Sequence, residues 1–142
     1  MNVSSVMTPN PACCTASTPL REVARMMLDN DCGQIPVVDE SQRPIGVVTD
    51  RDIAVRVVAE GRDTNQATAA DAMSMPVRTV TSDTSLKDAV CVMEADQIRR
   101  VPVVDANGKL AGIVAIADLA LAGKQEATAE VVREVSEPST RH

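Results

Sequence analysis

Residues 35–39 read I-P-V-V-D and residues 46–52 read G-V-V-T-D-R-D, and these two stretches decide the fold. Each begins with a short apolar run rich in β-branched residues, which is typical of strands. The pattern returns 66 positions later as V-P-V-V-D at 101–105 and G-I-V-A-I-A-D at 112–118. An Asn-Gly pair between the later runs is typical of a hairpin turn. The chain therefore contains a duplicated unit.

The repeat extends towards the N-terminus without a gap. The same offset of 66 pairs Met7 with Met73, Thr15 with Thr81, Thr18 with Thr84, Leu20 with Leu86 and Met27 with Met93. Thr18-Pro19 is typical of a helix start, with threonine as the predicted N-cap and proline in the first turn. The apolar residues that follow have helical spacing, and the second copy repeats this spacing from Leu86. A second helix is expected from near Asp50 to Gly61, and its counterpart from near Ile116 to near Gly123.

Each unit is thus predicted to be strand, helix, strand, strand, helix. One unit has too few elements to cover both faces of its sheet. We therefore expect an α/β (α+β) fold of two motifs, each a small three-stranded sheet with two helices, packed about a pseudo-twofold axis. The predicted divisions are 1–62 for the first motif, 63–123 for the second, and 124–142 for a C-terminal helix and flexible tail. The polar stretch 62–70 is expected to join the motifs.

Composition excludes several classes of function. The 142 residues include no Phe, Tyr or Trp and carry a net charge of -6, which disfavours nucleic-acid binding. The four cysteines form no CxxC pair and the only histidine is His142, so a zinc site is not expected. The start lacks the features of a signal peptide, and no apolar run is long enough to span a bilayer. We expect a soluble cytoplasmic protein with reduced, partly buried thiols.

The repeated motifs resemble the CBS domain family, named for cystathionine β-synthase. The first copy contributes V-M-T at 6–8, I-P-V-V-D and G-V-V-T-D-R-D, and the second contributes A-M-S, V-P-V-V-D and G-I-V-A-I-A-D. The resemblance covers residues 3 to 122 and implies a stand-alone tandem pair with two clefts. It also implies adenosine-type ligands such as AMP, ADP, ATP or S-adenosylmethionine, and pairing of two modules into a disc-shaped homodimer.

The resemblance also implies which residues bind the ligand. The predicted ligand-binding residues are Thr49, Asp50, Arg51, Asp52, Arg99, Arg100 and Asp118. The aspartate of the G-h-h-[ST]-x-x-D motif would take the ribose hydroxyls, its Ser or Thr would lie near the phosphate, and the arginine pair would contact phosphate from the other copy. The second copy has Ala115 in the threonine position, so its phosphate contact is weakened. Its cleft is expected to gather Asp118 and Ala115 with Gly33 and Gln34.

Elementary chemistry supports these roles and leaves alternatives open. A carboxylate at position 52 accepts two hydrogen bonds from a cis-diol, and free N–H groups at a helix start favour phosphate. Thr49 and Asp52 also fit a capping box, which is compatible with ligand binding. Arg99 and Arg100 would hold phosphate bidentately, or would instead be solvated or paired with nearby carboxylates.

We expect a regulatory adenine-nucleotide sensor (AMP, ADP or ATP) that acts through an unidentified partner protein, forms a homodimer and is not an enzyme. About one tight site per chain is expected, in the cleft of Thr49 and Asp52. The alternative is a ligand-free structural or protein-interaction module, and a weaker one is a nucleic-acid-linked protein. No catalytic cofactor, metal or membrane partner is expected.

Overall fold

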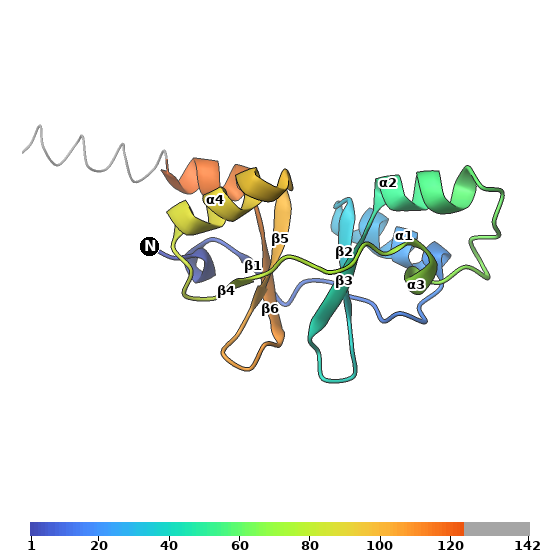
Figure 1. Cartoon of the computed structure of the whole chain (residues 1–142), viewed down its shortest axis with the longest axis horizontal. Coiled ribbons are helices and arrows are strands. Elements are labelled where there is room, and N and C mark those ends of the chain that lie inside the picture. The colour runs from blue at the N-terminus through green and yellow to red at the C-terminus, as the bar shows by residue number, and fades with distance from the viewer. Residues whose placement is uncertain (124–142) are drawn as a thin grey trace, which may run out of the picture.

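The computed structural model describes residues 1–123, which form two halves lying side by side (Figure 1). The predicted C-terminal helix and tail at 124–142 lie outside the described residues. Both halves combine helices with a small sheet, which confirms the predicted mixed α/β (α+β) class. In the described part of the chain, no helix is both long and apolar enough to cross a membrane.

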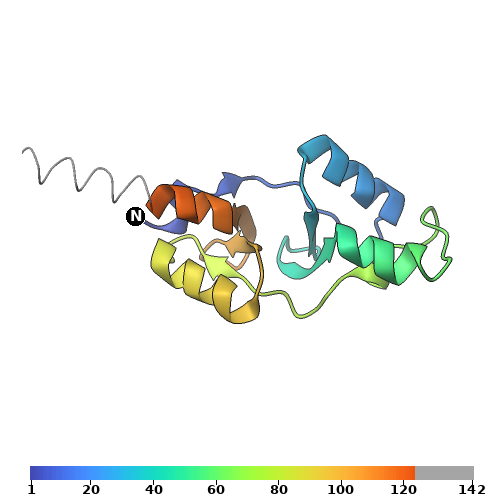
Figure 2. The ribbon, with the colours of Figure 1, turned by 90° about the horizontal axis from the view of Figure 1, so that it is seen from above.

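The two copies of the repeat form matching elements. The first copy forms α1 (Leu20–Asn30), β2 (Gln34–Val38), β3 (Pro44–Thr49), α2 (Asp50–Ile53) and the π-helical turn η2 (Ala54–Val58). The second forms β4 (Val80–Thr81), α4 (Leu86–Asp96), β5 (Arg100–Val104), β6 (Leu110–Ala115) and a helix from 116 to the last described residue, 123. Seen from above, α1 and α4 lie diagonally opposite each other, as a twofold relation requires (Figure 2).

The two sheets differ in size from the three strands predicted for each. One sheet has four strands in the order β1-β6-β5-β4, where β1 is Thr8–Pro9, and the other has only β2 and β3. In the smaller sheet, single bridges from Cys14 to Val37 and from Val47 to Ser74 stand where the larger sheet has β4 and β1. The same pattern is therefore present twice, with longer ladders in the second copy.

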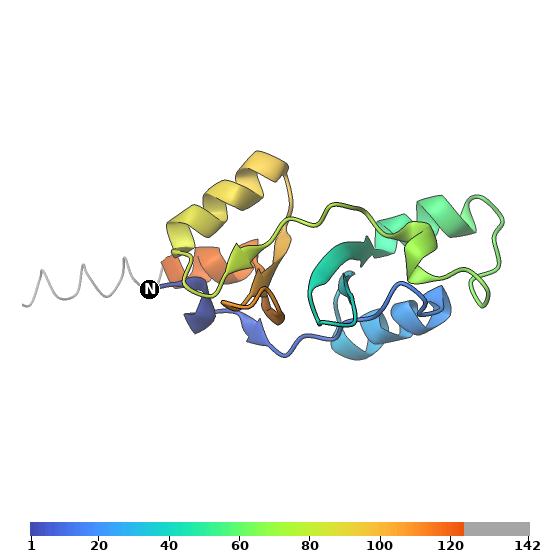
Figure 3. The same ribbon diagram turned by 60° about the horizontal axis from the view of Figure 1, so that its bottom comes forward.

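Each copy sends its first segment into the other half. Thr8 pairs with Ile113, and the equivalent Ser74 bridges to Val47, so the crossing is reciprocal. The short 3-10 helix η1 (Val3–Ser5) brings Val3 into the core of the second half. Figure 3 shows the two crossing segments passing between the halves on opposite sides. The chain is thus interlocked, because neither core is complete without a segment of the other copy.

The stretch 62–70 does more than join the motifs. Ala67 and Ala69 are almost completely buried, and they lead into the short helix α3 (Ala69–Ala72), which packs in the core of the first half. Thr68 and Asp71 form a capping box at the start of α3. The alanine side chains are small enough to pack closely in this core. The sequence did not indicate that they are buried, because the residues around them are polar.

The repeated glycines at 46 and 112 are explained by the crossing segments. A Cβ atom on Gly112 would lie 2.9 Å from the carbonyl oxygen of Thr8, and one on Gly46 would lie 3.0 Å from that of Ser74. Each strand after the turn therefore needs a residue without a side chain where the other copy's segment passes.

Helix starts differ from the prediction in the first copy. Pro19 occupies the N-cap of α1, with no side-chain cap, and the Thr18 hydroxyl instead accepts a hydrogen bond from the Thr15 N–H at 3.1 Å. In the second copy the cap is Ser85, whose hydroxyl accepts from the Asp88 N–H at 3.1 Å. The helix after Thr49 ends as predicted near Gly61, which has a φ of 72°.

Candidate functional site

A large cleft lies where the two halves face each other. It has a volume of about 1070 Å³, and six of the seven predicted ligand-binding residues line it: Thr49, Asp50, Arg51, Asp52, Arg99 and Arg100. Thr49 ends β3, the two aspartates and Arg51 begin α2, and both arginines stand at the start of β5. The cleft therefore combines the end of a hairpin from the first copy with the start of one from the second.

Thr49 and Asp52 form the capping box that the sequence indicated. The Thr49 hydroxyl accepts from the Asp52 N–H at 3.1 Å, and the Asp52 Oδ2 accepts from the Thr49 N–H at 2.9 Å. The other carboxylate oxygen, Oδ1, lies 3.9 Å from Nε of Arg56, and the Asp52 side chain is 14% exposed. Since a carboxylate has about four lone-pair sites, the cap leaves acceptors for a diol.

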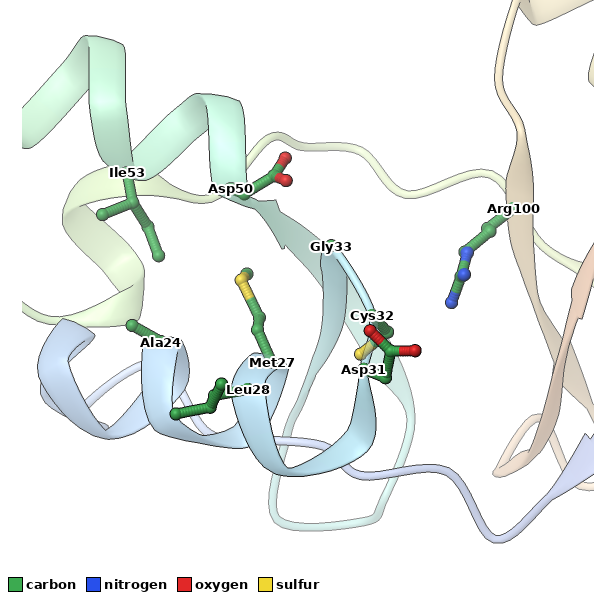
Figure 4. A pocket seen from close by; sticks show the side chains of 9 residues that line it. All are labelled: Ala24, Met27, Leu28, Asp31, Cys32, Gly33, Asp50, Ile53 and Arg100. Atoms are coloured by element: carbon green, nitrogen blue, oxygen red, sulfur yellow. The ribbon is translucent and has the colours of Figure 1, made fainter.

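The arginines lie on the opposite wall of the cleft. Arg99 is exposed and Arg100 is half-buried, and within residues 1–123 neither forms an ion pair. The alternative in which they pair with nearby carboxylates is therefore not what the structure shows. The Arg100 side chain extends from β5 towards the half that carries Asp31 and Asp50 (Figure 4). A guanidinium in that position has donors free for an anion.

Gly33 brings the hairpin and α2 close together at the cleft. Its carbonyl oxygen accepts from the Asp50 N–H at 3.0 Å, and a Cβ atom on Gly33 would lie 2.9 Å from Oδ2 of Asp50. The expectation that Gly33 belongs to the second cleft is wrong, because Gly33 lines the large cleft alone of the two, whereas Gln34 lines both.

Sequence reasoning missed an ion pair on the wall of the large cleft. Nε of Arg78 lies 3.2 Å from Oδ2 of Asp96, and both residues line the cleft. Their counterparts in the first copy are Ala12 and Asn30, which are uncharged. The sequence did contain a signal for this ion pair. When the two copies are aligned, these two positions carry opposite charges in the second copy and no charge in the first.

A small cleft stands in the equivalent place for the other copy, and its volume is about 160 Å³. Arg100 and Gln34 both line it, and it also contains Thr8, Asn10, Asn30 and Cys32. The expectation that this cleft gathers Asp118 and Ala115 is wrong, since neither residue lines it. Asp118 is exposed, and its Oδ2 accepts from the Ala115 N–H at 3.3 Å. Its carboxylate therefore caps the last helix outside the cleft.

A third hollow lies between α1 and α2, with a volume of about 580 Å³ (Figure 4). Ala24, Met27, Leu28 and Ile53 form its apolar wall, and Arg100 stands at its end. Leu28 is 69% exposed, and Val55 and Val58 on η2 are also exposed. Within residues 1–123, this apolar helix surface is left exposed.

The cysteines give no indication of a metal or redox centre. All four are free, and burial is the main factor that raises the pKa of Cys14 to about 12, with the charges of Cys13 and Glu22 adding to it. A thiol with so high a pKa is a poor nucleophile. Among the residues that the structure describes, no cluster of three potential metal ligands occurs.

The comparisons with known proteins identify the family. The CBS domain model matches residues 3–59 and 69–124, so this chain belongs to the CBS domain family. The CBS domain-containing protein YhcV of Bacillus subtilis is 40% identical over 120 residues, which are 84% of each chain. The uncharacterized protein MK0525 of Methanopyrus kandleri is 42% identical over 98 residues, 69% of this chain, and the match covers half of that protein.

The fold is also shared with solved CBS-pair structures. The structure of CBSX2 from Arabidopsis thaliana in complex with AMP is similar to this chain with a TM-score of 0.76 and 29% identity. The match covers 89% of this chain and 98% of that one. A pair of CBS motifs is therefore the architecture of both proteins.

Proposed function

We propose that this protein is a regulatory module that binds an adenine nucleotide in the large cleft. One observation carries the proposal: Thr49 and Asp52 from the first copy face Arg99 and Arg100 from the second across one cleft. That arrangement offers acceptors for ribose hydroxyls on one side and guanidinium donors for phosphate on the other. The AMP complex of CBSX2 supports an adenosine-type ligand.

The cleft also supplies apolar walls for an adenine ring. Since the chain has no aromatic residue, these walls are aliphatic, and they are Val47, Pro76, Val77, Ile98 and Pro102. In the proposed complex Asp52 accepts the ribose hydroxyls while keeping its cap to the Thr49 N–H. Phosphate lies near Thr49 and the N-terminal N–H groups of α2, with Arg51, Arg99 and Arg100 around it.

Regulation would follow from contact with both halves at once. A ligand that bridges the halves stabilises one relative arrangement of them, and it shifts the population only by its differential affinity for that arrangement. A partner protein that contacts both halves would then sense the ligand. We propose no catalytic role for the chain, and a cytoplasmic location stays a prediction.

A thermal-shift and calorimetric panel with AMP, ADP, ATP and S-adenosylmethionine tests the proposal. At a ligand concentration of a hundred times Kd, binding to the folded state adds about 2.7 kcal/mol of stability. For a domain of this size the melting temperature should rise by about 5–10 °C. An external dye or calorimetry must report the change, because the chain has no Trp or Tyr. An unmoved melting temperature with all four compounds would contradict ligand binding.

In that event the ligand-free interaction module becomes the better proposal. The Thr49–Asp52 capping box favours it, since a structural cap explains both residues without a ligand.

We also propose a homodimer built on the exposed apolar face of α1 and η2. Leu28, Val55 and Val58 would be covered by a second copy, because an exposed apolar patch is stabilised by self-association. Light scattering at micromolar concentration should give the mass of a dimer, and Leu28→Asp should give a monomer. A monomer in the unmodified protein would refute this arrangement.

A further inference from the structure

We infer that the small cleft receives the terminal phosphates of a nucleoside polyphosphate whose nucleoside lies in the large cleft, so that ATP and ADP bind more tightly than AMP. This inference rests on the proposed function, since it assumes a nucleotide in the large cleft. The two clefts share Gln34 and Arg100, which line both of them. Arg100 is therefore within reach of a group in either cleft, and the proposed phosphate chain follows it from the large cleft into the small one.

The size of the small cleft decides what can enter it. Its volume of about 160 Å³ lies below the ~300–1,000 Å³ typical of small-molecule sites. It therefore suits phosphate groups better than a second whole nucleotide, for which the large cleft of about 1070 Å³ has more room.

The charges of the small cleft favour an anion. Arg100 is its only charged lining residue, so a phosphate there meets a guanidinium and no carboxylate. The large cleft has three lining carboxylates, those of Asp50, Asp52 and Asp96, together with four arginines, and one of these arginines, Arg78, is paired with Asp96. The lining of the small cleft thus offers a phosphate a guanidinium with no carboxylate beside it.

Neutral donors in the small cleft complete the site. It contains the side-chain amides of Asn10, Asn30 and Gln34 and the hydroxyl of Thr8. One N–H of Asn30 donates to the carbonyl oxygen of Met26 at 2.8 Å, which leaves its second N–H free for a phosphate. Asn30 corresponds to Asp96 in the second copy, so a neutral amide stands here where the large cleft has a carboxylate.

The test is calorimetric titration of the full chain with AMP, ADP and ATP. Affinity should rise in that order, with about a tenfold difference between AMP and ATP, the effect of about one charge-assisted hydrogen bond. Asn30→Asp and Asn10→Asp each place a carboxylate in the small cleft. Each should weaken ATP binding about tenfold and leave AMP binding within about twofold.

Asn107→Asp is the matched control, because it makes the same charge change in the exposed turn before β6. It should leave the affinities for AMP and ATP unchanged. Asn10 is in a turn with a φ of 48°, a conformation that aspartate tolerates, so Asn10→Asp carries the test if Asn30→Asp does not fold.

Three results would overturn the inference while the proposed function stands. ATP would bind no more tightly than AMP, or the two variants would weaken AMP and ATP equally, or two AMP molecules would bind each chain. If none of the three nucleotides binds the unmodified protein, the proposed function itself fails and the inference falls with it.

Discussion

The first copy of the repeat ends its second hairpin strand with Thr49, and the second copy ends it with Ala115. Both strands lead into a helix, and the third residue of each helix is an aspartate that accepts the N–H of that last strand residue. The first copy forms the full capping box and lines the large cleft, whereas Asp118 is exposed and outside both clefts. Duplicated sequences thus keep a local cap, while only the cap of the first copy lines the large cleft.

The largest expected effect concerns the glycines under the crossing segments. Gly112→Val should destabilise the protein by about 3 kcal/mol, because its Cβ would approach the Thr8 carbonyl to 2.9 Å and the strand must shift. Gly46→Val should cost less, since no atom would lie closer than 3.0 Å to its Cβ, whereas at Gly112 two side-chain atoms of Met7 also would. Chemical denaturation measures both changes. If the two variants lost equal or negligible free energy of unfolding, the crossing segments would be shown to adjust freely.

The next comparison sets Asp52 against Asp118. Asp52→Ala should weaken AMP binding by about 1–3 kcal/mol, or roughly 5- to 150-fold, because it removes the acceptor for the ribose hydroxyls. Arg100→Ala should have a similar effect on the phosphate side. Asp118→Ala should leave affinity unchanged, since that side chain lines neither cleft. Calorimetry in which Asp118→Ala is the most damaging change would reverse the assignment of the clefts.

The helix caps of the two copies can be compared by exchanging the residue that precedes each helix. Thr49→Ala removes the hydroxyl that accepts the Asp52 N–H and should cost about 1 kcal/mol. Ala115→Thr adds the same hydroxyl to the second copy and should stabilise it by a similar amount. Melting temperatures in the absence of nucleotide measure both. No gain from Ala115→Thr would mean that the exposed helix start of the second copy cannot use a cap.

The smallest expected effect is on the way stability changes with pH, to which the two crossing segments should contribute differently. The Thr68 backbone N–H, and then Arg62, lower the pKa of Asp71, whose counterpart in the first copy is the uncharged Ser5. A lowered carboxyl pKa gives stability that is present above the unfolded value and is lost as pH falls through the folded one. Asp71→Asn should therefore lower the melting temperature slightly at pH 6 and very little near pH 3. A constant difference across that range would contradict the linkage.

Much of the candidate site could be predicted because it is local. Thr49, Asp50, Arg51 and Asp52 are consecutive, so a strand followed by a helix places them together whatever the rest of the chain does. Arg99 and Arg100 precede a strand that repeats the first copy, and the twofold relation sends them to the opposite wall. Whether Asp118 lines a cleft could not be predicted in this way, because local sequence does not show whether a helix start faces a cleft or solvent.

The sequence by itself determined the duplication, the hairpins, the helices and the Thr49–Asp52 cap, since these depend on periodicity and on residues three or four positions apart. Only the tertiary structure decided that the first segment of each copy completes the other half, that the Arg78–Asp96 pair lies at the large cleft, and that Arg100 lines both clefts. These contacts join residues far apart in the chain, and their geometry depends on how two packed halves meet. No local pattern of residues encodes that geometry.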